Sequence, residues 1–86
     1  MPEISRFLGI VIYMYFNEHN PPHFHAEYNE HKASIAIKTL SLIEGKLPPK
    51  VMGLVVEWAQ KNQQALLDNW NTIKRTGEYC KIIPLV

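Results

Sequence analysis

The 86-residue sequence has a single cysteine, Cys80, and therefore no intrachain disulfide. A chain with one thiol is compatible with a reducing cytosol, where structural disulfides are rare. Because an isolated cysteine usually behaves as a small apolar side chain, we expect Cys80 to be buried and structural and not to be a catalytic thiol. The cysteine content excludes a secreted scaffold held together by disulfides.

The sequence also lacks an apolar run long enough to cross a membrane. Its longest run, residues 7–16, has about half of the roughly 20 residues that a transmembrane helix needs. The start Met1-Pro2-Glu3 lacks the basic segment of a signal peptide. These absences predict a soluble protein of the cytoplasm.

A strong net charge is missing as well. The formal charge of +1 at pH 7 does not by itself indicate a polyanionic partner. The four histidines would add positive charge on mild acidification, because their ordinary pKa is about 6.5. A chain of this length is expected to form one domain, residues 1–86. Such a small core can depend on a partner chain or on a homo-oligomer for stability.

Hydrophobic periodicity predicts strands in the N-terminal half of the chain. Residues 10–16 contain β-branched and aromatic side chains, a pattern typical of a central strand. The clearest alternation with a period of two lies in residues 32–38. We expect strands over residues 4–8, 10–16, 23–28 and 32–38, a short edge strand over 39–44, and a final strand over 79–85.

The C-terminal half has the pattern of amphipathic helices. Pro48-Pro49 suits a first helical turn, and apolar residues then recur at spacings of three and four. Asn62 either caps a second helix or lies within one continuous helix, and Gly77 is placed to end it. The fold class is therefore α+β: an antiparallel sheet of four to five strands with two C-terminal helices packed on one face. Two tryptophans on the apolar stripe are predicted to be core residues: Trp58 and Trp70.

The most distinctive segment is residues 17–28, where three of the four histidines lie within seven residues, around Pro21-Pro22. Along a strand over residues 23–28, alternation sends the odd-numbered side chains to one face and the apolar ones to the other. If the apolar face meets the helices, the opposite face is open and carries polar side chains from several strands. We expect function on this open face, which would hold His23, His25, Glu27, Lys32, Ser34 and Lys38, with Tyr13 and Tyr15 beside them.

One chemistry that this pattern favours is metal binding. His23 and His25 are two residues apart on a strand, so both imidazoles can share one ion. Glu27 extends the row, and His19 can reach in from the preceding loop. Imidazole and carboxylate ligands suit zinc, nickel or iron. The corresponding function is a metal-binding module without catalysis.

The other chemistry is acid–base catalysis without a cofactor. A neutral histidine can take a proton while a protonated partner supplies one, which suits metal-independent RNA cleavage with the 2′-hydroxyl as nucleophile. His23 and His25 would be the pair, supported by His19 and Glu18 from the loop. Phosphate contacts and base stacking would come from Lys32, Lys38, Arg6, Tyr13 and Tyr15. A further alternative is a purely protein-interaction domain, in which the histidine loop is only architectural.

The motif Asn-Glu-His-x-Pro-Pro-His-Phe-His at residues 17–25 resembles the hallmark of a small bacterial family, number 4160 in the domain-of-unknown-function series. Other segments that fit the family are residues 12–16, 45–48, 57–59, 66–70 and 83–85. The family has no settled activity, so the resemblance carries over no catalytic residue. It implies a component of a toxin–antitoxin-like module with a small cognate protein partner. Combined with the open face, it predicts a protein that acts on or binds RNA.

Overall fold

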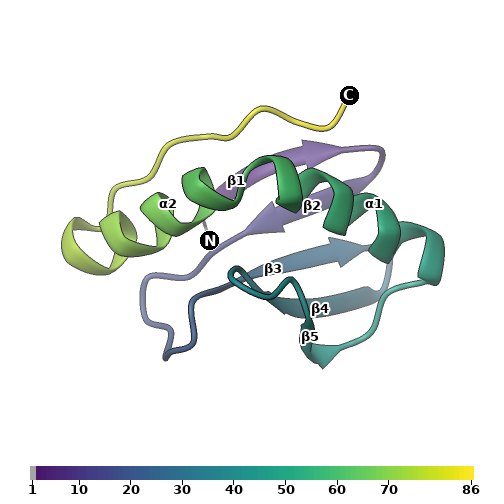
Figure 1. The fold of residues 1–86 in the computed structure, drawn as a ribbon, viewed down its shortest axis with the longest axis horizontal. Helices are drawn as coiled ribbons and strands as arrows, with labels where there is room; N and C mark the ends of the chain where they lie inside the picture. The colour runs from purple at the N-terminus through teal and green to yellow at the C-terminus, as the bar shows by residue number, and fades with distance from the viewer. Residues whose placement is uncertain (1) are drawn as a thin grey trace.

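The computed structural model describes residues 2–86. These residues form a five-stranded antiparallel sheet followed by two helices. Neighbours along the chain are also neighbours in the sheet, so the strands form a meander. Both helices lie on the same side of the sheet (Figure 1). The predicted α+β architecture is confirmed. Its elements are β1 (Glu3–Phe7), β2 (Ile10–Tyr13), β3 (His23–Tyr28), β4 (His31–Ala36), β5 (Leu42–Gly45), α1 (Pro49–Lys61) and α2 (Gln63–Thr76).

One apolar cluster joins the sheet to the helices. Trp58 on α1 is fully buried, and its ring centroid lies 5.5 Å from that of Phe7 and 6.0 Å from that of Phe24. Trp70 on α2 belongs to the same cluster. Both tryptophans are therefore core residues, as predicted. The sheet contributes Ile4, Ile10, Ile12, Phe24, Ala26 and Ile35, and the helices contribute Val55, Trp58, Leu66, Trp70 and Ile73.

Asn62 divides the helical region in two. It is at once the C-cap of α1 and the N-cap of α2, and its side-chain amide donates to the carbonyl oxygen of Trp58 at 2.8 Å. Of the two possibilities for Asn62, the helix break is the one that forms. Gly77 ends α2 with a φ of +81°, a left-handed conformation that favours glycine.

Two strands are shorter than their apolar patterns predict. β2 ends at Tyr13, after which the chain leaves the sheet as the loop that leads to β3. β4 ends at Ala36, because the next residues form a turn in which the Leu40 N–H donates to the Ala36 carbonyl oxygen at 2.8 Å. Lys38 therefore lies in a turn and not on the open face of a strand. Its carbonyl oxygen accepts a 3.3 Å hydrogen bond from Gln63 at the start of α2.

The expected final strand does not form, and residues 78–86 follow α2 as a segment without strand structure (Figure 1). Helix side chains pair with several of its backbone groups. The Asn69 amide pairs with the N–H and the carbonyl oxygen of Cys80, at 2.8 and 2.7 Å, and the Trp58 indole donates to the Ile83 carbonyl oxygen at 2.8 Å. The Ile82 N–H donates to the Ile4 carbonyl oxygen of β1. Cys80 is exposed, so the prediction of a buried cysteine is wrong.

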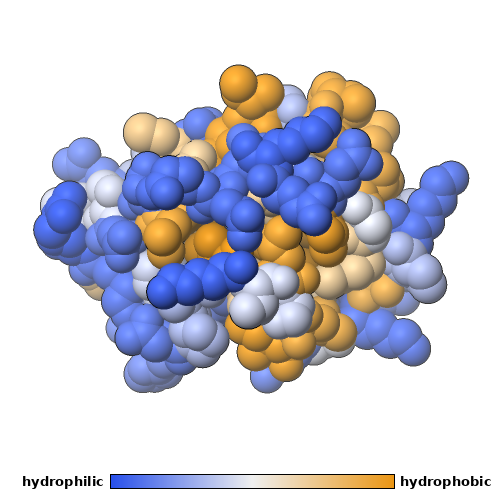
Figure 2. Space-filling model, viewed as in Figure 1, coloured by the Kyte–Doolittle hydropathy of each residue, from blue (hydrophilic) through white to orange (hydrophobic). Residues whose placement is uncertain are grey.

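The surface shows no helix suited to a bilayer: within residues 2–86, neither helix combines the length and the apolar character that crossing a membrane requires. Hydrophilic residues predominate at the left end of the view in Figure 2, where Figure 1 draws the end of α2. A hydrophobic area lies below the centre, in the region of β5. On that edge strand, Leu42 and Ile43 are each nearly half exposed.

Candidate metal centre

Strand alternation places the histidines as predicted. Phe24 and Ala26 of β3 are fully buried in the core, whereas His23 and His25 are only partly buried. The strand register sets His25 opposite Tyr13 of β2 and opposite Ser34 of β4. Because directly paired residues share a face, these side chains form one row on the face of β3 opposite Phe24 and Ala26, and in that row Tyr13 and Ser34 are buried.

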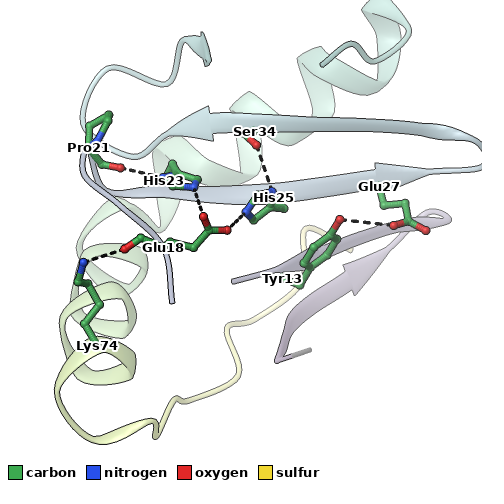
Figure 3. A network of polar contacts seen from close by, with 8 residues as sticks. All are labelled: Tyr13, Glu18, Pro21, His23, His25, Glu27, Ser34 and Lys74. Carbon is green, nitrogen blue, oxygen red and sulfur yellow. Dashed lines mark hydrogen bonds and ion pairs between the residues drawn. The ribbon is translucent and has the colours of Figure 1, made fainter. Parts of the chain in front are cut away.

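The loop between β2 and β3 brings a carboxylate to both imidazoles. One oxygen of Glu18 lies 2.5 Å from Nε2 of His25, and the other lies 3.4 Å from Nε2 of His23 (Figure 3). Donor atoms of the three residues all lie within 4.8 Å of one another. The side chains retain 22%, 11% and 17% exposure for Glu18, His23 and His25, so solvent still reaches the cluster.

The remaining ring nitrogens also have protein partners. Nδ1 of His23 lies 2.8 Å from the Pro21 carbonyl oxygen, and Nδ1 of His25 lies 3.1 Å from the Ser34 hydroxyl. A carbonyl oxygen can only accept, so Nδ1 of His23 carries a proton and Nε2 of the neutral ring is an acceptor. That acceptor faces a carboxylate oxygen of Glu18, which is an acceptor too. The contact is attractive when His23 is doubly protonated, when the Glu18 carboxyl carries a proton, or when a cation bridges the two atoms.

Aromatic rings surround the cluster. Tyr13 stacks on His25 with a centroid distance of 5.2 Å, and Tyr15 meets the same ring edge-on at 5.0 Å. His23 contacts Trp70 of α2 at 5.1 Å. Lys74, one turn further along α2, donates to the Glu18 carbonyl oxygen at 2.9 Å and thereby ties the loop to the helix. The imidazoles are thus held in fixed orientations by packing on both sides.

The surroundings of Tyr13, which stacks on His25, change its ionisation. Burial, with Tyr15 and Glu27 beside it, raises the pKa of Tyr13 to about 12. Its hydroxyl donates to Glu27 at 3.5 Å. The phenol therefore stays protonated, and neutral, well above the ordinary tyrosine pKa of about 10.

A change in stability at high pH follows from the raised pKa of Tyr13. Between pH values of about 10 and about 12, the unfolded chain releases this proton and the folded chain keeps it, so the free energy of unfolding falls as pH rises. Urea unfolding at several pH values measures this fall. Tyr13→Phe should show a smaller fall than the parent protein, and equal slopes would contradict the raised pKa.

The other residues expected at the site are not gathered at the cluster. Glu27 points to Tyr13 and lies 4.0 Å from Lys32, so Glu18 supplies the carboxylate that we had expected from Glu27. His19 is exposed on the loop and is not one of the three clustered residues. Arg6 pairs with Glu3 at 2.7 Å. The sequence holds one signal for Glu18, which is that it is the one carboxylate within the histidine motif, residues 17–25.

A shallow depression of about 240 Å³ adjoins the cluster, with His25 in its wall. Its other walls come from β2, β4, β5 and the loop after β2, and they include Tyr15, Lys32, Ser34 and Glu44. A second, larger hollow of about 420 Å³ lies between α2 and residues 78–83, away from the histidines. Only the smaller one can bring a ligand next to the clustered donors.

Comparison with known proteins identifies the family alone. No curated protein and no solved structure matches the chain. The family described as a domain of unknown function (DUF4160) matches residues 9–71, which include Glu18, His23, His25 and the strands that hold them. Because this match covers well over half of the sequence, the chain belongs to the DUF4160 family.

Proposed function

We propose that the protein binds one divalent transition-metal ion through Glu18, His23 and His25. The observation that carries the proposal is the convergence of their donor atoms within 4.8 Å. Ligands of a tetrahedral zinc ion, each about 2.1 Å from the metal, stand about 3.4 Å apart. The 3.4 Å separation between Glu18 and His23 equals that value, whereas the 2.5 Å separation between Glu18 and His25 is shorter and would have to lengthen. A small shift of Glu18, which lies on a loop, is enough to admit an ion.

The hydrogen bonds behind the imidazoles support the same function. Histidines that bind metals usually engage their other ring nitrogen with a carbonyl, hydroxyl or carboxylate, which fixes the tautomer. His23 does so with Pro21 and His25 with Ser34. Two imidazoles and one carboxylate suit zinc, nickel or iron(II). Three protein ligands leave a coordination position for water or a substrate.

The distribution of charge favours a metal ion over a long RNA strand. Arg6 and Lys32 each face a carboxylate, and Lys38 lies in a turn outside the cluster. Glu27 and Glu44 add negative charge to the same face of the sheet. A tract of unpaired basic side chains, which binding to a polyanion requires, is therefore not formed by these residues.

Calorimetric titration of untagged protein with Ni²⁺ or Zn²⁺ tests the proposal. We expect about one equivalent to bind at a pH of about 7.5. Binding should weaken on acidification, because metal ligands must be deprotonated and protons compete with the metal for them. His31→Ala is the matched control, since His31 lies outside the cluster and pairs with Glu30 at 3.8 Å. A protein that shows no binding even at about 1 mM metal would have at most a very weak affinity, and this result would overturn the proposal.

Metal-independent RNA cleavage is the second candidate, and the proximity of two imidazoles favours it. The His23 and His25 rings lie 5.2 Å apart and share Glu18, which can hold one ring protonated. RNA incubated with the protein in excess chelator should then be cleaved, and His23→Ala should abolish the cleavage whereas His31→Ala should not. Cleavage that survives His23→Ala would exclude the pair.

The family resemblance adds a cellular context to the proposal. It suggests a bacterial, cytoplasmic toxin–antitoxin-like module in which this chain pairs with a second small protein. Arrest of bacterial growth on expression, relieved by co-expression of the protein encoded next to it, would support this context. Unimpaired growth with either protein, alone or together, would count against it.

A further inference from the structure

The depression beside the metal cluster has the chemistry of a small binding site. It combines an aromatic ring (Tyr15), a cation (Lys32) and a carboxylate (Glu44), with His25 at the boundary to the cluster. Glu44 is directly opposite Ser34 across the β4–β5 ladder, and Ser34 contacts His25. The depression and the proposed metal ligands are therefore parts of one continuous surface.

We propose that this depression binds one nucleoside monophosphate unit, free or as part of single-stranded RNA, with its base on Tyr15 and its phosphate at Lys32. This inference rests on the proposed function in one respect: His25, a proposed metal ligand, also lines the depression. Recognition itself depends on residues outside the metal cluster, so the two proposals can fail separately.

Tyr15 is the residue that can stack a base. Its side chain follows β2 and is 39% exposed, and its ring touches the edge of His25. Tyr13, the other tyrosine predicted to stack on a base, is 3% exposed and is already stacked on His25. Stacking on an aromatic side chain tolerates every base, so Tyr15 would supply affinity with little sequence preference.

Glu44 would supply a preference among bases. A carboxylate accepts hydrogen bonds and cannot donate them, so it selects an exocyclic amino group, as on cytosine or adenine, over a carbonyl, as on uracil. The neighbouring Gly45 has a φ of +81°, and a Cβ there would lie 2.1 Å from the Lys32 carbonyl oxygen. At Gly45 the wall of the depression is therefore formed by backbone atoms, with no side chain between Lys32 and Glu44.

A single phosphate fits the charge of this surface better than a chain of phosphates. The Lys32 side chain is 70% exposed and reaches Glu27 only at 4.0 Å, so its ammonium can turn to a ligand. Glu27 and Glu44 lie on either side and would repel further phosphates. We therefore expect one nucleotide unit to occupy the site, even when it belongs to a longer strand.

The experiment measures binding of cytidine monophosphate, uridine monophosphate and cytidine by calorimetry, with and without Ni²⁺. Cytidine monophosphate should bind best. Tyr15→Ala should weaken its binding about tenfold or more, whereas the matched change Phe16→Ala, at an exposed aromatic outside the depression, should not. Glu44→Gln should remove the preference for cytidine over uridine monophosphate. Lys32→Ala should remove the advantage of the phosphate over the plain nucleoside, and Lys38→Ala should leave it intact.

The outcomes separate the two proposals. Binding of Ni²⁺ without any binding of the nucleotides would overturn the nucleotide site and leave the metal site standing. Nucleotide binding that needs Tyr15, in a protein that takes up no Ni²⁺, would support the nucleotide site and overturn the metal site. Equal effects of Tyr15→Ala and Phe16→Ala would also overturn the nucleotide site. Binding of a cytidine tetranucleotide as tight as that of the monophosphate would identify RNA as a source of the unit, and much weaker binding of the tetranucleotide would identify the free nucleotide.

Discussion

His25→Ala is expected to lower the affinity for Ni²⁺ or Zn²⁺ on the order of 100-fold. The substitution removes one of three proposed ligands. Zinc binding at a structural site is worth roughly 10 kcal/mol, and about a quarter to a third of this free energy per ligand corresponds to an affinity change on the order of 100-fold. His25 is the ligand whose ring lies closest to Glu18, at 2.5 Å. Glu18→Gln should have an effect of similar size, because an amide oxygen is a weaker ligand for these ions than a carboxylate. Calorimetric titration of each purified variant measures the change.

The controls for this prediction separate a lost ligand from a lost fold. His31→Ala should bind the metal like the parent protein, since His31 lies at the far end of the β3–β4 pair, opposite Tyr28. Urea unfolding of His25→Ala should show a loss of only about 1–2 kcal/mol, the usual range for a partly exposed polar side chain. A protein that unfolds on this change would show that the histidine is architectural, and a folded protein that binds Ni²⁺ unchanged would show that His25 is not a ligand.

Trp58→Ala is expected to have the largest effect on stability, about 4 kcal/mol. The indole is fully buried between α1 and the sheet, against Phe7 and Phe24, and its N–H donates to the Ile83 carbonyl oxygen. Truncation would leave a cavity at the centre of the core and would release residues 78–86 from α1. Because domains are typically only about 5–15 kcal/mol stable, this loss would be a large share of the total stability.

Urea unfolding followed by far-ultraviolet circular dichroism measures the effect of Trp58→Ala. Trp58→Phe should lose less, about 1–2 kcal/mol, because it keeps a ring in the core and gives up mainly the hydrogen bond to Ile83. Phe16→Ala, at a ring that is 60% exposed, should change stability by less than about 1 kcal/mol. Equal losses for Trp58→Ala and Phe16→Ala would contradict the described core.

The face on which the histidines lie could be predicted from the sequence because alternation is a local property of a strand. β3 has the predicted bounds, and its buried Phe24 and Ala26 set the side of His25. The ends of β2 and β4 could not be predicted in the same way. Their apolar patterns continue beyond Tyr13 and Ala36, but the strands end there. After Tyr13 the chain enters the loop that leads to β3, and after Ala36 it forms the turn closed by the hydrogen bond from Leu40 to Ala36.

The identity of the carboxylate and the path of the C-terminal segment depend on contacts between distant residues. Glu18 reaches His25 only because the loop folds back over β3, and Lys74, 56 residues further on, holds that loop. Spacing along the strand pointed instead to Glu27, which shares the face but points to Tyr13. Residues 79–85 have the composition of a strand, yet the side chains of Asn69 and Trp58 donate hydrogen bonds to two of their carbonyl oxygens, those of Cys80 and Ile83.

Anomalous diffraction from crystals grown with Zn²⁺, recorded at the zinc absorption edge, tests the central claim most directly. We predict one strong peak at about 2.1 Å from Nε2 of His23, from Nε2 of His25 and from a carboxylate oxygen of Glu18. A peak confined to other residues, or none at this cluster in crystals with saturating zinc, would contradict the assignment of these three side chains as a metal centre.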